Sequence, residues 1–282
     1  MSSSWVWNQG RVVPAERATV AADDLGLLRG EGIFETVSVR DREPFMLDRH
    51  LDRLRTSAKI TGIAVPWTDD DLATACAETI AAAAGDPENL QVPRFRLRIT
   101  VTSGRGSSRG APTLLVMVAP DVEHPGGAKV GICPWPVNEM SPLVGAKVTS
   151  RHDYTLAHHD AVARGADEAV LYNTRGMLVE GSATNLFLVV AGRLSTPSLA
   201  TGCLPGVTRS LIVDLVEVHE RDDLTADDLR FATEAFLAST TRGVQPISEV
   251  DGKALRSSPG PLTTAARNAL ENLRTSRTTD RV

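Results

Sequence analysis

The fold of this chain is decided by residues 177–187, MLVEGSATNLF, where an apolar run ends at Glu180 and a turn of small residues leads into a second apolar run. The second run continues over 185–190 and predicts a buried strand, because it is almost entirely apolar. An acid between two such runs is not expected to be a solvated surface charge. The pattern also fits an acid that caps a turn, so Glu180 is a candidate functional residue with a structural alternative.

Outward from this stretch, short strands and helices follow one another in both directions. In the second half, strands are expected near 130–133 and at 168–172, 185–190 and 234–237, and helices at 153–164 and from Gly206 to about Val218. In the first half, strands are expected within 4–13 and 32–47 and at 94–102 and 112–119, and helices at 69–84 and, behind an Asp48 cap, at 48–60. The tail beyond Leu270 is rich in Arg, Thr and Asp and is expected to fray. The pattern predicts an α+β protein.

One segment lacks periodicity altogether. Residues 120–128, PDVEHPGGA, contain two prolines and two glycines and fit neither a helix nor a strand. A chain of 282 residues is long enough for one large domain or two modest ones. We therefore expect a small N-terminal domain at 1–120, an interdomain linker at 121–128 and a larger domain at 129–282.

Composition excludes several classes of protein. The chain has 42% hydrophobic and 23% charged residues and a net charge of -5, which favours a soluble protein and argues against a nucleic-acid partner. No apolar run approaches the roughly 18 residues of a membrane span, and the first residues lack a signal-peptide pattern. We expect a cytoplasmic protein without a membrane partner. The three cysteines show no CxxC and no His/Cys ligand spacing, so neither a disulfide framework nor a metal site is expected.

Lysine chemistry has few candidates, because the chain contains four lysines: Lys59, Lys129, Lys147 and Lys253. Lys147 stands in Gly-Ala-Lys-Val-Thr-Ser, where small residues leave room around the amine, as a Schiff-base lysine needs. A surface lysine is the alternative interpretation. The other three fit a helix face, a strand start and a turn.

Two segments are candidates for anion binding. Residues 202–209, GCLPGVTR, run directly into an apolar-periodic helix, whose first N–H groups and positive dipole end favour a phosphate, and Thr208 adds a hydroxyl. Ser239, Thr240 and Thr241 follow a strand and offer further hydroxyls. Each segment alone also fits an ordinary loop. A third segment, 104–110 (GRGSSRG), has the glycines of a phosphate loop but leads into a strand, which excludes a dinucleotide fingerprint.

Together these features resemble one family. The order of a helix-borne arginine, a lysine, a glutamate, Gly-Val-Thr-Arg and Ser-Thr-Thr is similar to that of the fold-type IV pyridoxal-phosphate enzymes, the class IV aminotransferases. Matching stretches cover most of the chain from about 20 to 250: 29–36, 50–54, 165–169, 180–187, 204–209 and 235–241. The resemblance implies an α+β fold with a small N-terminal α/β domain and a larger C-terminal domain with a β-barrel-like core. It also implies pyridoxal 5'-phosphate as the cofactor.

The resemblance implies a role for each site residue. Lys147 would form the Schiff base with the cofactor and then move the proton between the substrate Cα and the cofactor C4′. Glu180 would pair with the pyridine nitrogen and so strengthen the ring as an electron sink, and Arg151 would approach the ring hydroxyl. The groups expected to bind the phosphate are Arg53, the amides of Val207 and Thr208, and the hydroxyls of Ser239 and Thr240.

The implied partners are an amino acid and a 2-oxo acid, handled by a homodimer in which the small domain of one subunit closes the other's active site. D-amino-acid transamination is favoured. The better-known D-amino-acid enzymes bind the α-carboxylate with an Arg-x-His pair, but this chain has Thr-Ser-Gly-Arg at 102–105. We expect Arg29 of the partner subunit and Arg98 to bind the carboxylate instead, and Phe34 and Thr241 to contact the substrate. A solvated sheet face is the alternative for Arg98 and its neighbour Arg96.

Two other activities and one inactive state stay open. Residues 104–110 resemble the glycine- and arginine-rich loop of aminodeoxychorismate lyases, which release pyruvate and 4-aminobenzoate instead of transferring the amine. Branched-chain L-amino-acid transamination ranks third, because it needs an aromatic-lined pocket and the chain has two tyrosines and six phenylalanines. An inactive binding protein of this fold is a further hypothesis, and the intact Lys147, Glu180 and Arg53 argue against it.

Overall fold

The computed structural model describes residues 3–106, 111–124 and 126–279. The chain divides into two compact units, which are described separately. The first unit comprises Met1–Val122 and Ala146–Ser150, and the second comprises Glu123–Gly145 and Arg151–Val282. The boundaries expected from the sequence, 1–120, 121–128 and 129–282, remain a prediction about the domains. In the structure, residues 146–150 group with the first unit although they follow the expected linker.

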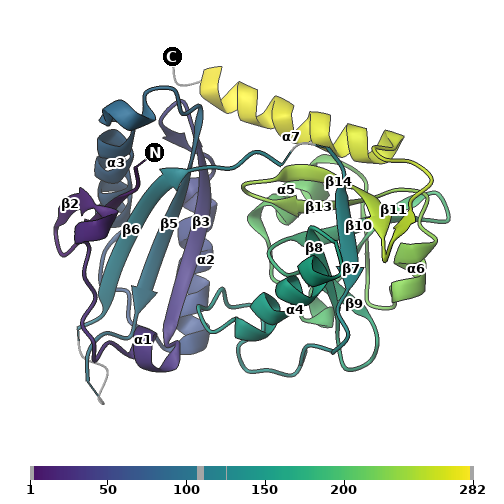
Figure 1. Cartoon of the computed structure of the whole chain (residues 1–282), viewed down its shortest axis with the longest axis horizontal. Coiled ribbons are helices and arrows are strands. Elements are labelled where there is room, and N and C mark those ends of the chain that lie inside the picture. Colours follow the sequence, from purple (N-terminus) through teal and green to yellow (C-terminus); the bar gives the residue numbers. More distant parts are fainter. Residues whose placement is uncertain (1–2, 107–110, 125, 280–282) are drawn as a thin grey trace. The chain divides into compact units, whose positions relative to one another are not determined.

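The first unit is built on a six-stranded antiparallel sheet with the order β2-β1-β6-β5-β3-β4 (Figure 1). Its strands are β1 (Trp5–Asn8), β2 (Arg11–Pro14), β3 (Gly32–Arg40), β4 (Glu43–Pro44), β5 (Arg94–Thr102) and β6 (Thr113–Pro120). Its helices are α1 (Leu25–Arg29), α2 (Leu47–Thr61) and α3 (Asp69–Gly85), with short 3-10 turns at Ala15–Arg17 and Pro87–Asn89. Helices α2 and α3 pack on one face of the sheet, where Leu54, Leu72 and Leu97 are fully buried.

Local sequence accounts for both long helices. Helix α3 begins with a capping box between Thr68 and Asp71, which satisfies two orphan backbone donors. Helix α2 begins after Met46 without a side-chain cap, so the expected Asp48 cap is wrong. Asp48 lies instead in the first turn, where its charge favours the positive end of the helix dipole.

The alternation of β3 separates a core face from a second face. Ile33, Val37 and Val39 are fully buried in the core shared with the helices, whereas Phe34 and Thr36 point to the opposite face. The short strand β4 pairs only with the C-terminal end of β3, at Val39 and Arg40. The N-terminal part of that edge is covered by residues 147–149, because the Phe34 N–H donates to the Lys147 carbonyl (2.9 Å) and the Thr149 N–H to the Gly32 carbonyl (2.8 Å). This pairing explains why 146–150 belongs to the first unit.

The second unit contains a curled, mixed sheet of nine strands in the order β12-β11-β10-β13-β14-β7-β8-β9, with β15 paired to β14. Its strands are β7 (Ala128–Ile132), β8 (Glu168–Tyr172), β9 (Leu178–Gly181), β10 (Asn185–Val190), β11 (Arg193–Pro197), β12 (His219–Arg221), β13 (Ala235–Ser239), β14 (Gly243–Val250) and β15 (Lys253–Ala254). Its helices are α4 (His152–Ala163), α5 (Val207–Leu215), α6 (Ala226–Arg230) and α7 (Pro261–Thr279), with a 3-10 turn at Leu199–Thr201. At its centre Phe187 and Phe236 stack across β10 and β13 at 4.7 Å.

The α+β class and the curled second sheet expected from the sequence are confirmed. The expectation of a frayed tail beyond Leu270 is wrong, because α7 continues to Thr279 and packs against α5 and β14 (Figure 1). Its first turn is anchored by buried Glu234, which accepts the N–H groups of Leu262 and Thr263. Within the described ranges, no helix is long and apolar enough to cross a membrane.

Candidate active site

Lys147 is held by its backbone on the edge of β3. Its N–H donates to the Ser57 hydroxyl of α2 (3.0 Å), and its carbonyl accepts the Phe34 N–H (2.9 Å). The side chain is half-buried between two buried neighbours, Ala146 and Val148. Its Nζ lies 4.5 Å from the centre of the Phe34 ring. Lys147 is therefore not a freely solvated surface lysine.

Phe34 brings a second cation to the same place. The guanidinium carbon of Arg98 lies 3.8 Å from the centre of the ring, and its Nε donates to the Thr100 hydroxyl (3.2 Å). Burial, reinforced by the charge of Arg96, lowers the pKa of Arg98 to about 10. Arg98 remains cationic at neutral pH and is half-buried, whereas Arg96 is exposed. The structure thus brings Phe34, Arg98 and Lys147 together, and the solvated-face alternative holds for Arg96 alone.

Arg53 is oriented by a fully buried acid. Glu35, on the core face of β3, accepts the Arg53 Nε (2.8 Å) and Nη2 (2.7 Å), and its Oε2 lies 2.7 Å from the His50 Nδ1. Burial alone would raise the pKa of Glu35, but the Arg53 charge and the hydrogen bonds from Arg53 and His50 outweigh it and lower the pKa to about 2. Desolvation lowers the pKa of His50, and the nearby charges of Arg53 and Lys147 lower it further. Two of the Arg53 nitrogens are thus fixed by Glu35.

Glu35 and His50 were missed as functional candidates. The available signal was an acid among the inward-facing residues of an alternating strand, between Ile33 and Val37. Arg29 lies at the C-terminal end of α1, where its side chain is 62% exposed and its Nη1 is 3.7 Å from Glu31. Within one chain, Arg29 is therefore a surface residue.

In the second unit, Glu180 is buried on β9 and surrounded by donors. Its Oε2 accepts the Leu204 N–H (3.0 Å) and lies 3.3 Å from the Asn185 Nδ2, and its Oε1 is 3.8 Å from the Arg151 Nη2. The guanidinium of Arg151 stacks on the Tyr154 ring at 3.9 Å. Burial, together with the negative charge of Glu180, raises the pKa of Tyr154, so its phenol stays protonated. Tyr154 was not singled out in the sequence, where it is one residue of an ordinary helix.

The start of α5 is joined to Glu180 through Asn185. The Asn185 amide also donates to the Leu204 carbonyl (2.9 Å), and a Cβ on Gly206 would lie 1.9 Å from its Oδ1. Gly206 is the N-cap of α5 and supplies no side-chain hydrogen bond, although Val207 and Thr208 are buried. Buried helix-start N–H groups without a side-chain cap are suited to an anion.

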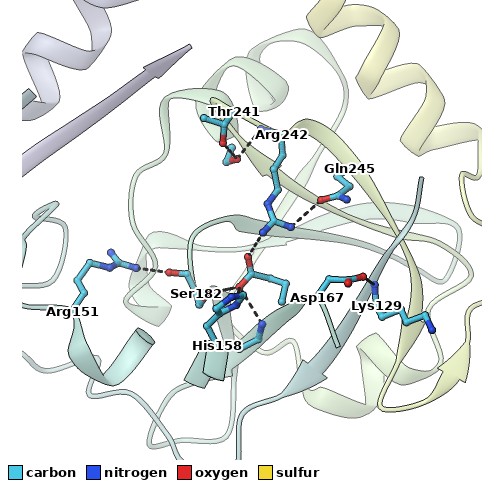
Figure 2. A network of polar contacts seen from close by, with 11 residues as sticks. Lys129, Arg151, His158, Asp167, Ser182, Thr241, Arg242 and Gln245 are labelled. Atoms are coloured by element: carbon cyan, nitrogen blue, oxygen red, sulfur yellow. Dashed lines mark hydrogen bonds and ion pairs between the residues drawn. The ribbon is translucent and has the colours of Figure 1, made fainter. Parts of the chain in front are cut away.

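Ser239 is the last residue of β13, which pairs Ala238 with Asn185, and Thr240 and Thr241 follow it. The Ser239 and Thr241 hydroxyls are 3.5 Å apart, and Ser239 accepts the Arg242 N–H (3.2 Å; Figure 2). All three residues are half-buried. Because β13 also packs against α5, this turn and the helix start belong to the same part of the second unit.

The chemistry of these groups fits pyridoxal phosphate. An uncapped buried helix start and neighbouring hydroxyls suit a phosphate, and a buried carboxylate next to an arginine suits a protonated ring nitrogen. Within the first unit by itself, a half-buried amine lies beside an aromatic ring. In the described part of the chain, no cluster of three or more His, Cys, Asp or Glu residues is placed to bind a metal ion.

Comparison with known proteins gives the class of this protein. The family model "Amino-transferase class IV" matches residues 32–250. The chain belongs to the class IV aminotransferase family, whose members use pyridoxal phosphate.

Relatives span almost the whole chain. A branched-chain-amino-acid aminotransferase of Pseudomonas aeruginosa is 29% identical over 95% of this chain and 92% of its own length. A D-alanine aminotransferase of Bacillus licheniformis is 27% identical, over 93% of this chain and 94% of its own. The branched-chain aminotransferase of Thermoproteus uzoniensis, solved with norvaline, is 31% identical with a TM-score of 0.84, covering 96% of this chain and 94% of that one.

Proposed function

We propose that this aminotransferase uses Lys147 to transfer the amino group of a D-amino acid to a 2-oxo acid. The observation that supports the proposal is that the Lys147 amine and the Arg98 guanidinium both lie on the Phe34 ring, 4.5 and 3.8 Å from its centre. A cation beside the reacting amine would bind the substrate carboxylate while the Cα hydrogen faces Lys147.

The site residues of the first unit have different parts in the proposed reaction. Pyridoxal phosphate, when bound, supplies an electron sink for the bonds at the substrate Cα. The Lys147 Nζ would take the proton from the substrate Cα and deliver it to the cofactor C4′, and the Phe34 ring would limit water around the amine. Arg98 orients the carboxylate. Arg53 contributes to phosphate binding in an orientation fixed by Glu35.

The second unit would supply the other groups that bind the cofactor. Glu180 would hold a proton on the ring nitrogen, and Arg151, whose guanidinium stacks on the Tyr154 ring, would approach the ring hydroxyl. Thr241 is proposed to contact the substrate. The groups proposed for the phosphate are the amides of Val207 and Thr208 and the hydroxyls of Ser239 and Thr240.

The preference for a D-amino acid rests on the arginines. Arg29 is exposed at the end of α1 and is thus accessible to a second subunit, and 102–105 lacks the Arg-x-His pair. We propose a homodimer in which Arg29 of the partner subunit joins Arg98 at the carboxylate. Branched-chain L-amino acids are the second candidate, because relatives named for that activity match nearly the full length of the chain.

The lyase activity stays an alternative prediction. Residues 107–110 of its loop lie outside the described residues, and Arg105 is an exposed residue that forms an ion pair with Asp23 at 2.8 Å.

The test is a half-reaction followed by absorbance. The purified, pyridoxal-phosphate-loaded enzyme is mixed separately with D-alanine, D-glutamate, L-leucine and L-glutamate, and conversion of the bound cofactor to its pyridoxamine form is recorded. Conversion with the D-amino acids alone supports the proposal. Conversion with L-leucine would favour the branched-chain candidate, and no conversion with any of them would contradict both.

A further inference from the structure

A buried ion pair lies between the two cofactor-binding turns of the second unit. Glu168, the first residue of β8, has a side chain that is 0% exposed, and its Oε2 accepts the Arg242 Nη2 at 2.8 Å. Arg242 is 11% exposed, and its Nη1 donates to the Gln245 side chain (2.9 Å). Figure 2 shows Arg242 next to Thr241 in its turn, with Gln245 beside its guanidinium.

On one side, Glu168 binds the turn that follows Glu180. Its Oε1 accepts the Ser182 N–H (3.1 Å) and the Ser182 hydroxyl, while the Ser182 carbonyl accepts the Arg151 Nη2 (3.1 Å). Glu168 therefore determines where the chain turns between Glu180 and Asn185, the two residues that meet at the Leu204 backbone.

On the other side, Arg242 is itself part of the turn that carries the hydroxyls of Ser239, Thr240 and Thr241. The backbone N–H of Arg242 donates to the Ser239 hydroxyl (3.2 Å). Helix α7 also binds this turn, since the Arg274 Nη2 donates to the Thr240 carbonyl (3.3 Å), and it binds the start of β14 through the Arg267 Nε, which donates to the Val244 carbonyl (3.2 Å). The turn is thus held from two directions by arginines.

We propose that the Glu168–Arg242 ion pair is a positioning pair that fixes the distance between the carboxylate for the ring nitrogen and the hydroxyls for the phosphate. The inference rests on the proposed function, because it assigns those ends to Glu180 and to Ser239–Thr240. A buried ion pair is in general no more stabilising than apolar residues of the same volume, so stability alone does not account for it. A rigid connection between two turns, by contrast, holds the groups that bind both ends of a ligand at the distance that the ligand requires.

The experiment separates positioning from stability by removing both charges together. Arg242→Met leaves a buried, unpaired Glu168 and is expected to destabilise the fold. The double variant Glu168→Gln/Arg242→Met has no unpaired charge, so its melting temperature should recover while the connection stays broken. Each apoenzyme is titrated with pyridoxal phosphate, following protein fluorescence, and then with inorganic phosphate as a competitor.

We expect the double variant to bind pyridoxal phosphate roughly 10- to 100-fold more weakly than the wild type, which is the loss typical when the residues that orient metal ligands are removed. The affinity of the double variant for inorganic phosphate should fall in parallel. Arg242→Lys keeps the charge without the planar fork and should lose affinity several-fold, which keeps the test decisive if the Met variants do not fold. Arg221→Met is the matched control, because its partner Asp223 lies on the surface.

The outcomes are distinct. Wild-type affinity in the folded double variant, or in Arg242→Lys if only that variant folds, would overturn the positioning role and leave the pair with a structural one. A wild-type apoenzyme that binds no pyridoxal phosphate would instead contradict the proposed function, and the inference with it.

Discussion

Glu35, His50 and Arg53 form a charged cluster inside an apolar core, and its charge state depends on pH. The folded pKa of Glu35 is about 2, against an ordinary value of 4.5, because Arg53 and His50 stabilise the carboxylate more than burial destabilises it. A lowered folded pKa contributes stability that is fully present above pH 4.5 and is lost as the pH falls from there towards 2.

We predict that the wild type loses about 3 kcal/mol of unfolding free energy across that window through Glu35 alone. Glu35→Gln should have a lower unfolding free energy than the wild type at pH 7. Its unfolding free energy should also fall less steeply in acid, since the variant has no carboxylate to protonate. Urea unfolding of the first unit, repeated at pH values between 7 and 3, measures both differences. Glu78→Gln, at an exposed acid of α3, is the control and should follow the wild type; an equally steep acid limb in Glu35→Gln would contradict the assignment.

Arg98 and Arg96 are neighbours on one face of β5 but differ in environment. Arg98 contacts Phe34 and Thr100, and Arg96 is exposed. Arg98→Met should raise the KM for the amino acid roughly 10- to 100-fold, the contribution of a charge-assisted hydrogen bond, and should leave the spectrum of the bound cofactor unchanged. Arg96→Met should change KM little. Equal effects of the two substitutions in steady-state kinetics would remove Arg98 from the substrate site.

At the scale of elements, the segment with Lys147 is placed by pairing with the edge of β3 and by one hydroxyl of α2. Ser57 is 0% exposed and accepts the Lys147 N–H. Ser57→Ala leaves this N–H without its partner and should lower the unfolding free energy by about 1–3 kcal/mol. Thr56→Ala, which removes an exposed hydroxyl bonded to Asp52 on the same helix, should cost less. Thermal melting compares the stability of the two variants. An equal loss of stability in both would show that the Ser57 contact does not stabilise the fold.

Helices and strands with a clear apolar pattern in their own sequence could be predicted, and those without such a pattern could not. The periodicity of α2 and α3, the alternation of β5 and the apolar run of β10 were enough to assign them. Strands β11 and β14 were missed because their polar residues and prolines hide the pattern, although Ser195, Thr196 and Gln245 are buried by the strands on either side. The last turns of α7 were missed for a similar reason: they are polar, and the Arg274 side chain there is buried and donates to the Thr240 carbonyl.

At the scale of the whole molecule, the assignment of Arg29 requires two subunits and is tested by complementation. Lys147→Ala removes the reacting amine and Arg29→Ala weakens the carboxylate site, so each homodimer should be nearly inactive. In a mixed dimer, the subunit that keeps Lys147 receives Arg29 from its partner, and one complete site is restored.

Random co-assembly makes half of the dimers mixed, each with one good site, so the co-expressed variants should show about a quarter of wild-type activity. Mixing the two purified homodimers without subunit exchange is the control and should show none. Activity no higher than the homodimers' in the co-expressed sample would mean that Arg29 acts within its own subunit or not at all.

The sequence by itself determined the family, the cofactor and the α+β class, because motifs such as Glu180-Gly181-Ser182 and Gly206-Val207-Thr208 combine local chain geometry with the residue types that the chemistry needs. Only the tertiary structure decided which charges are buried and what they contact. Glu35 meets Arg53, the Lys147 segment pairs with Gly32–Phe34, and Glu168 meets Arg242, all across long stretches of chain. Burial and ion pairing depend on residues that are distant in sequence, and the apolar periodicity of one segment does not contain that information.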